Sequence, residues 1–257
     1  MSGEVDVART DDILTLTIAR PEKRNALTAA MYDTLEQACR EAAADRGVRV
    51  VVLRGAGGAF AGGTDIGDLQ QIRTGADGVA YEARMRAVQQ ALLDLRVPVI
   101  AVVDGVCVGG GLVLAALSDL VLATPAARFG SPIARTLGNT LSATSMARLQ
   151  QCFGRRRTSE MLLTGRLVGA EEATHAGFVT RLCEADELES ALEEMLAAIR
   201  SAAPLSLASF KELERRIDAA LATVEVEDVY RQIYGSRDFR EGVEAFLARR
   251  PADFEGH

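Results

Sequence analysis

The sequence predicts an α/β fold with a parallel sheet, followed by a helical C-terminal region. Short valine-rich runs bounded by glycine or proline occur at residues 48–53 and 97–103, and such runs are typical of strands covered on both faces. Stretches with apolar residues at helical spacing lie between them. Because strands alternate with helices, we expect right-handed crossovers between parallel strands.

Local patterns predict the elements of the first half. Residues 13–18 alternate between apolar and polar side chains and end before a proline, which predicts an edge or meander strand. Thr28 is a typical N-cap, and we expect a helix from there to Asp45. A further helix is expected at residues 77–96 and a further strand at residues 120–123.

The pattern changes in the second half. Beyond about Leu141 it is nearly all helical, and residues 178–182 form the only strand expected there. Three consecutive helices are expected at residues 204–221, 225–234 and 238–249, the last opened by a capping box of Asp238 and Glu241. We therefore divide the chain into an α/β core, residues 1–200, and a C-terminal helical region, residues 201–257.

Composition excludes several classes of function. The chain has 257 residues, 48% hydrophobic content, a net charge of −7 and a pI near 5.1. A negative chain without a long basic run repels nucleic acid and anionic membranes, so a small molecule is the expected partner. The longest wholly apolar run, residues 106–117, is shorter than the roughly 20 residues of a membrane span. The N-terminus lacks the pattern of a secretory signal, so we expect a cytoplasmic protein.

Most standard catalytic motifs are absent. The four cysteines stand far apart and there are only two histidines, so we expect no metal site. The third glycine of a dinucleotide-binding G-x-G-x-x-G is replaced in both glycine clusters, by Phe60 and by Leu114. There is no Gly-Lys pair for a phosphate-binding loop and no G-x-S-x-G elbow. His175 ends an expected helix without a nucleophile or orienting partner, and we interpret it as structural.

Two glycine-rich segments carry the functional signal. The first glycine segment, residues 55–66, and the second glycine segment, residues 104–112, each follow a buried-type strand. Small residues let a ligand approach the main chain, and the second segment runs into a helix whose first turn has free amides. Each segment alone could be only a tight strand-to-helix turn. Together they could supply one amide each to a single carbonyl oxygen, as enolate stabilisation requires.

These segments, with others in the same order and spacing, resemble the enoyl-CoA hydratase/isomerase (crotonase) family along nearly the whole chain. The matching segments are residues 20–27 (RPEKRNAL), 55–66, 98–105 (PVIAVVDG), 109–111 (GGG), 127–130 (ARFG), 163–166 (LTGR) and 241–247 (EGVEAFL). The resemblance implies a crotonase-like spiral of ββα units. It also implies that residues 201–257 mediate oligomerisation, as a homotrimer or a dimer of trimers.

The resemblance also implies site residues. The backbone amides of Thr64 and Gly110 match the family's oxyanion hole, which would bind the carbonyl oxygen of an acyl-CoA thioester. Coenzyme A would enter as part of the substrate, and no permanently bound cofactor is expected. The residues at positions that contact coenzyme A are Lys23, Arg24, Ala26, Asp65, Ile66, Lys211 and Phe254. The family usually has alanine where Thr64 stands, and its hydroxyl either adds a hydrogen bond or is merely tolerated. We favour tolerance, because the catalytic donor is the amide.

The chain departs from the family at the acid and base positions. Val113 and Ile133 stand where family hydratases usually carry glutamates, and a one-residue shift of the second position gives Ala134. Hydration needs a base and an acid, which these side chains cannot supply. Candidate replacement polar groups, most of them expected to be structural, are Asp68, Arg135, Thr136, Asn139, Thr140 and Ser142. Asp119, before a strand, is interpreted as structural.

Three functions follow as hypotheses. The first is an enoyl-CoA hydratase or isomerase-like enzyme that acts through an enolate bound by Thr64 and Gly110. The second is a non-catalytic acyl-CoA-binding or assembly protein, which the missing glutamates favour. The third is a carbon–carbon hydrolase or decarboxylase that uses the same oxyanion hole.

Overall fold

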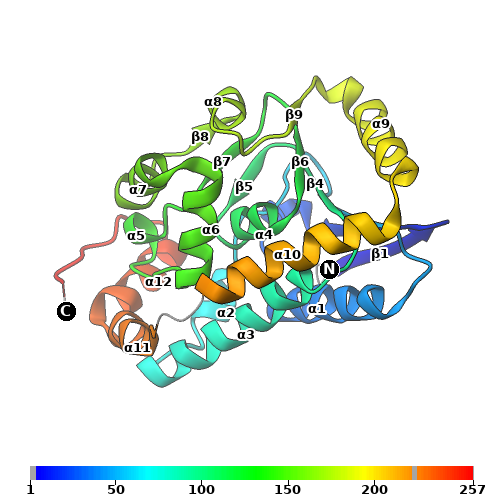
Figure 1. Ribbon diagram of the computed structural model, residues 1–257. Helices are drawn as coiled ribbons and strands as arrows, with labels where there is room; N and C mark the ends of the chain where they lie inside the picture. The colour runs from blue at the N-terminus through cyan, green and yellow to red at the C-terminus, as the bar shows by residue number, and fades with distance from the viewer. Residues whose placement is uncertain (1–3, 222–224, 257) are drawn as a thin grey trace.

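The computed structural model describes residues 4–221 and 225–256, and its core is a twisted six-stranded sheet (Figure 1). The strands lie in the order β1 (Glu4–Thr10), β2 (Ile13–Ala19), β3 (Val50–Gly55), β4 (Val99–Val103), β6 (Leu120–Ala123) and β9 (Arg181–Leu182). β1 pairs with β2 in antiparallel fashion, and all other neighbours are parallel. The predicted parallel sheet of buried valine-rich strands is therefore confirmed.

A smaller second sheet runs beside the first and makes the fold a spiral. It consists of β5 (Val106–Val108), β7 (Arg128–Gly130) and β8 (Val168–Gly169). An isolated parallel bridge pairs Ala61 with Cys107 of β5 and so adds a further segment of chain to this sheet. The chain thus repeats a unit of one strand in the large sheet, one short strand or bridge beside it, and a helix. β4, β5 and the helix that follows them form one such unit.

Helices cover both faces of the large sheet. The helices of the first half are α1 (Ala29–Ala44), α2 (Ile66–Leu69), α3 (Gly75–Leu93) and α4 (Gly110–Leu117). Those of the second half are α5 (Ile133–Thr136), α6 (Ala143–Phe153), α7 (Arg155–Thr164), α8 (Ala170–His175), α9 (Leu188–Ser201), α10 (Pro204–Leu221), α11 (Glu227–Gly235) and α12 (Arg237–Ala248). Alternate residues of β3 pack on opposite faces, with Val51 in the core formed with α1, α3 and α4, and Val52 in the core formed with α9.

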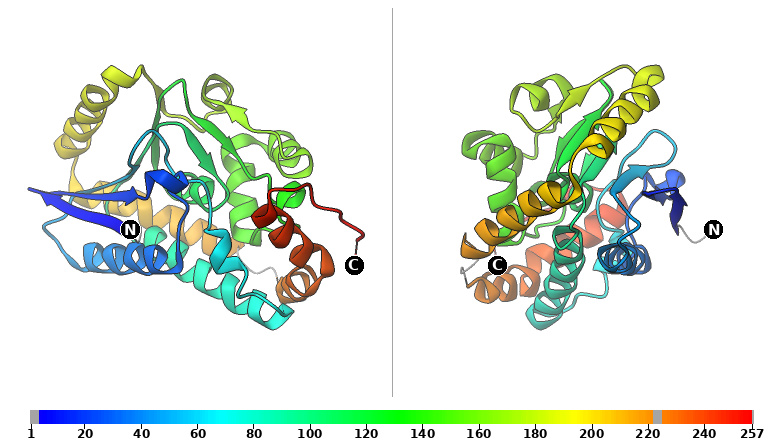
Figure 2. Two further views of the ribbon diagram at one scale, coloured as in Figure 1. Left: turned by 180° about the vertical axis from the view of Figure 1, so that it is seen from behind. Right: turned by 45° about the vertical axis from the view of Figure 1, so that its right-hand side comes forward.

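The C-terminal helices pack back on the core. α11 lies along the start of α3, and α12 contacts α2 and α5 (Figure 2). Tyr234 of α11 is fully buried against Gly78 of α3, where a Cβ atom would overlap the tyrosine side chain. α11 and α12 are therefore packed on helices of the α/β core.

Several predictions about local structure were wrong. Of the two alternatives for residues 13–18, the edge strand is wrong, because β1, which the sequence did not reveal, covers β2. The strand itself is confirmed and pairs with its neighbour β1 in antiparallel fashion, as in a meander. The strand expected at residues 178–182 contains only its last two residues. The predicted capping box at Asp238 does not form, since Ser236 caps α12 by accepting from the Phe239 amide, and Glu241 pairs with Arg250 instead. The helices beginning at Thr28 and near residue 77 are confirmed, the second starting at Gly75.

Two kinds of feature, a membrane-spanning helix and a cluster of metal-ligating side chains, are absent from the residues that the structure describes. Within residues 4–221 and 225–256, no helix is both long and apolar enough to span a bilayer. The same residues contain no group of three or more metal-ligating side chains.

The close packing of Tyr234 against Gly78 can be tested through the stability of a variant. Gly78→Ala is expected to lower the free energy of unfolding by about 2 kcal/mol, because overpacking against Tyr234 outweighs the gain in helix propensity. Urea denaturation followed by circular dichroism measures this. Gly169→Ala is the control, since no atom lies within 4 Å of the added Cβ, and it should change stability by less than about 0.5 kcal/mol. Equal losses in the two variants would contradict this account of the packing.

Candidate functional site

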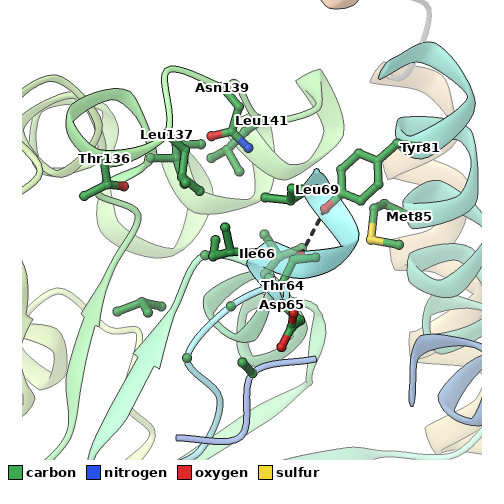
Figure 3. A pocket seen from close by; sticks show the side chains of 18 of the residues that line it. Thr64, Asp65, Ile66, Leu69, Tyr81, Met85, Thr136, Leu137, Asn139 and Leu141 are labelled. Carbon is green, nitrogen blue, oxygen red and sulfur yellow. Dashed lines mark hydrogen bonds between the residues drawn. The ribbon is translucent and has the colours of Figure 1, made fainter. Parts of the chain in front are cut away.

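A cavity of about 480 Å³ lies where the two glycine segments meet α3 and the C-terminal helices (Figure 3). Its wall contains Gly63 and Thr64 from the first segment and Gly109 and Gly110 from the second. α3 contributes the side chains of Tyr81, Glu82, Met85, Val88 and Gln89, and α11 and α12 contribute Tyr234, Phe246 and Leu247. The cavity therefore combines residues that are far apart in the sequence.

Hydrogen bonds from both sides fix the first glycine segment. The Leu27 amide donates to the Gly63 carbonyl, and the Asp65 amide donates to the Leu27 carbonyl, both at 2.8 Å. On the other side, the Val108 amide donates to the Ala61 carbonyl at 3.0 Å. Gly63 has φ +95°, which only glycine adopts without strain. The segment is thus held between the start of α1 and β5.

The second glycine segment approaches the first along its backbone. A Cβ atom on Gly111 would lie 2.6 Å from the Ala61 carbonyl oxygen, so only glycine permits this approach. Gly109 has φ +54° and ψ −122°, a conformation essentially restricted to glycine, and it caps α4. Its amide donates to the Gly130 carbonyl at 3.0 Å. These contacts place the first turn of α4 against Gly63.

The amides of Thr64 and Gly110 have no acceptor within the described residues. The bridge of Thr64 with Leu27 uses the carbonyl of residue 63 and the amide of residue 65, so the Thr64 N–H faces away from that strand. Gly110 is the first residue of α4, where amides have no partner inside the helix. Both residues line the cavity. Two amide donors from separate loops, neither with an acceptor among the described residues, therefore border one cavity.

The Thr64 hydroxyl is hydrogen-bonded, so the favoured prediction that it is merely tolerated was wrong. Its Oγ1 lies 3.0 Å from the hydroxyl of Tyr32 and 3.0 Å from that of Tyr81. The bond to Tyr81 is drawn in Figure 3. Burial raises the pKa of Tyr32 to about 12 and holds the pKa of Tyr81 well above its ordinary value, so both phenols stay protonated. The Tyr32 hydroxyl also lies directly against Gly110, where a Cβ atom would overlap it. This cluster ties α1, α3 and both glycine segments together.

The positions that lack glutamates line the cavity. Val113 and Ile133 both lie in its wall, and Val113 is buried. Leu114, Leu137 and Leu141 lie in the same wall. None of these five side chains can donate or accept a proton, although polar side chains of the segment 136–142 also line the wall.

Most residues implied to contact coenzyme A lie at this cavity, but two lie outside it. Lys23, Arg24, Ala26, Asp65 and Ile66 line it. Asp65 caps α2 and forms an ion pair with Arg20. Lys211 is outside the wall and pairs at 2.8 Å with Asp119, which also accepts from the Val99 amide and is thus structural as predicted. Phe254 lies beside Gly138, outside the wall.

The candidate replacement polar groups separate into two sets. Thr136, Asn139, Thr140 and Ser142 line the cavity, and Asn139 Oδ1 is buried without a partner among the described residues. Asp68 lies outside the wall and accepts from the Ala29 amide at the start of α1. Arg135 is exposed beside Gly165.

Glu82, which no sequence motif marks, also lies in the cavity wall. Its side chain is only 6% exposed and accepts a hydrogen bond from the Tyr234 hydroxyl. Burial raises its pKa, and the Tyr234 bond partly offsets that shift. The available signal was a carboxylate on the apolar stripe of α3, in register with Met85 and Leu92.

Comparisons with known proteins agree along the whole chain. The family model described as enoyl-CoA hydratase/isomerase matches residues 8–257. The chain is 33% identical over 247 residues to a protein of Rhizobium meliloti named "probable enoyl-CoA hydratase", covering 93% of each chain. It is also 33% identical to the 2,3-dehydroadipyl-CoA hydratase of Escherichia coli, covering 99% of each. A solved methylmalonyl-CoA decarboxylase in complex with 2-nitronate-propionyl-CoA matches with a TM-score of 0.89 and 27% identity, covering 98% of each chain.

The buried hydrogen bonds of Asn25 are expected to hold the first glycine segment in place, and a substitution can test this. Asn25 is fully buried at φ +56°, accepts from the Arg20 amide, and donates to the carbonyls of Ala56 and Ala59 at 2.8 and 2.6 Å. Asn25→Ala leaves these buried groups unpaired and should cost about 3 kcal/mol of stability, measured by urea denaturation. Arg249→Ala, at an exposed position with φ +53°, should cost less than about 1 kcal/mol. A similar loss in both would show that the hydrogen bonds of Asn25 do not account for the effect.

Proposed function

The chain belongs to the enoyl-CoA hydratase/isomerase family, and from that premise we propose that it is an enzyme that stabilises the enolate of an acyl-CoA thioester. The family acts on CoA thioesters. The thioester oxygen is bound by the amides of Thr64 and Gly110. Two unpartnered N–H groups at one cavity carry this proposal, because donors fixed before the reaction stabilise developing negative charge most effectively.

Coenzyme A would enter past the exposed basic side chains of Lys23 and Arg24, which line the cavity. Their charges suit phosphate groups in a chain whose net charge is −7. Ala26, Asp65 and Ile66 would border the pantetheine and adenine. Lys211 and Phe254 remain proposed contacts from the C-terminal region.

Decarboxylation of a 2-carboxyacyl-CoA is a second candidate reaction. Cleavage of the bond between C2 and the carboxylate leaves its electron pair on the enolate and releases CO₂, so no base is needed, and the enolate then takes up a proton at C2. The apolar wall at Val113 and Ile133 favours this reaction, because a carboxylate that loses water there is destabilised relative to CO₂. The similarity to a methylmalonyl-CoA decarboxylase, with a TM-score of 0.89, supports it.

We propose that residues 201–257 also join copies of the chain into a homotrimer or a dimer of trimers. A row of exposed apolar side chains on α10 supports this. Its members are Leu205, Phe210, Leu213 and Ile217, each more than half exposed. Such a row on a single chain is typical of a protein interface.

A panel of thioesters tests the proposed reaction. We expect turnover of at least one 2-enoyl-CoA, 3-enoyl-CoA or 2-carboxyacyl-CoA, followed by mass spectrometry, with hydration, isomerisation and decarboxylation distinguished by product mass and retention. Free coenzyme A affinity is measured in parallel. Binding without turnover across the panel would contradict the enzyme assignment and favour the non-catalytic alternative.

A matched pair of variants tests the Gly110 amide. In a Tyr32→Phe background, which makes room for a Cβ atom, Gly110→Pro removes the N–H while Gly110→Ala retains it. The proline variant should turn over at least about 100-fold more slowly than the alanine variant on the substrate found above. Free coenzyme A, which has no thioester carbonyl, should bind both equally. Equal turnover would show that this amide does not bind the oxyanion.

A further inference from the structure

Glu82 carries a buried carboxyl group in the cavity wall. It belongs to α3, whereas Val113 and Ile133, at the positions of the missing glutamates, belong to α4 and α5. Its only hydrogen-bond partner among the described residues is the Tyr234 hydroxyl. No ion pair neutralises it within residues 4–221 and 225–256, although Arg86, one turn further along α3, attracts its charge. A single phenol leaves much of a carboxylate's acceptor capacity unused.

The position of Glu82 connects it to the free amides. The preceding residue, Tyr81, bonds through its hydroxyl to Thr64 Oγ1 at 3.0 Å. The charge of Glu82 also acts on Tyr32, contributing to the raised pKa of that phenol, and the Tyr32 hydroxyl lies against Gly110. Glu82, Thr64 and Gly110 line the same cavity, and the phenols of Tyr81 and Tyr32 lie between the helix that carries Glu82 and the amide pair.

We propose that Glu82 is the proton-transfer residue of this cavity, a catalytic carboxylate supplied by α3 in place of the side chains absent at positions 113 and 133. This inference rests on the proposed function, because it assumes a thioester bound at Thr64 and Gly110. Tyr234 is a positioning residue, which holds the carboxylate in the wall.

The step is a reversible proton transfer at C2 of the thioester. A Glu82 carboxylate oxygen takes a proton from C2, so the C–H bond breaks and an O–H bond forms. The electron pair of the C–H bond becomes the double bond of the enolate, and the carbonyl electrons move to the oxygen held by the two amides. The protonated Glu82 then returns a proton to the enolate, and in heavy water it returns a deuteron.

The ionisation of Glu82 suits this role. Burial raises its pKa, so its basicity exceeds that of an exposed carboxylate, and general bases work best with a pKa near the operating pH. The titratable and charged groups around it are Tyr81 and Arg86 on α3, Tyr32 on α1, and Tyr230 and Tyr234 on α11. The pKa values of these phenols are all raised from an ordinary value that already lies above that of a carboxyl group, so Glu82 is the acidic group among them that ionises first as the pH rises.

Glu82→Gln tests the proposal by deuterium exchange. Acetyl-CoA, butyryl-CoA and octanoyl-CoA are incubated with the protein in heavy water, and deuterium at C2 is measured by mass spectrometry. The wild-type protein should exchange at least one of them, and Glu82→Gln should exchange it at least about 100-fold more slowly, since general acid–base catalysis contributes about 100- to 10,000-fold. Asp94→Asn, which removes an exposed carboxylate at the end of α3, should exchange at the wild-type rate.

A stability measurement separates catalysis from a structural role. Because the folded-state pKa of Glu82 is raised, its contribution to stability is lost as pH rises through that pKa. Glu82→Gln, which can still accept from Tyr234, should therefore melt at an equal or higher temperature than the wild type at pH 8, with the difference shrinking toward pH 5. A lower melting temperature with unchanged exchange would overturn the proposal and leave Glu82 a structural partner of Tyr234.

Tyr234→Phe gives a second readout. Exchange by an ionised base rises with pH through its pKa. Removing the hydrogen bond that lowers this pKa should move the inflection of the exchange rate to higher pH, whereas Glu82→Gln should abolish the inflection. An unshifted inflection overturns the proposal. If the thioesters bind but the wild type exchanges none of them, the role of Glu82 fails and the binding function stands; if none binds, the proposed function itself fails.

Discussion

The close approach of two backbone segments is the constraint on which the rest of the site depends. Gly111 lies against the Ala61 carbonyl, where no side chain fits, and Gly63 and Gly109 adopt positive φ on either side of the contact. Because the closest approach is between main-chain atoms, peptide geometry fixes the positions of the Thr64 and Gly110 amides, and the hydrogen bonds of the Thr64 hydroxyl to Tyr32 and Tyr81 support them. Asn25 holds one segment in place, and the bond of the Gly109 amide to Gly130 holds the other.

The side chains that line the cavity around this contact are of two chemical kinds, apolar and ionisable. Val113 and Ile133 form part of an apolar wall, whereas α3 and α11 bring a carboxyl group and several phenols. The phenols of Tyr32 and Tyr81 form hydrogen bonds with the Thr64 hydroxyl, so α1 and α3 contact one residue of the amide pair directly. The proposed reactions differ in which groups they use. The carbon–carbon bond cleavage of decarboxylation needs only the amides and apolar surroundings before the enolate takes up a proton, whereas removal of a proton from C2 needs the carboxylate.

The sequence was a good guide wherever the pattern was long. The buried strands at β3 and β4, the Thr28 cap and the helices of the C-terminal region follow from periodicity, and the match to the family confirms the crotonase-like α/β fold. β5, β7 and β8, of two or three residues each, are too short to show a period, and they were not predicted from pattern. β1 was missed because its exposed edge carries charged side chains that hide the alternation around Val5.

The sequence by itself determined which backbone amides could lack an acceptor, because its two glycine clusters follow buried strands and one of them begins a helix. It also determined what is absent, because valine and isoleucine cannot transfer protons wherever they lie. Only the tertiary structure decided what stands beside the amides. Glu82, Tyr32 and Tyr234 reach one cavity from three separate helices, and the register of a helix reports which residues face inward but not which other helix they meet. That choice depends on the packing of α11 against Gly78, a contact more than 150 residues apart in the chain and visible only after folding.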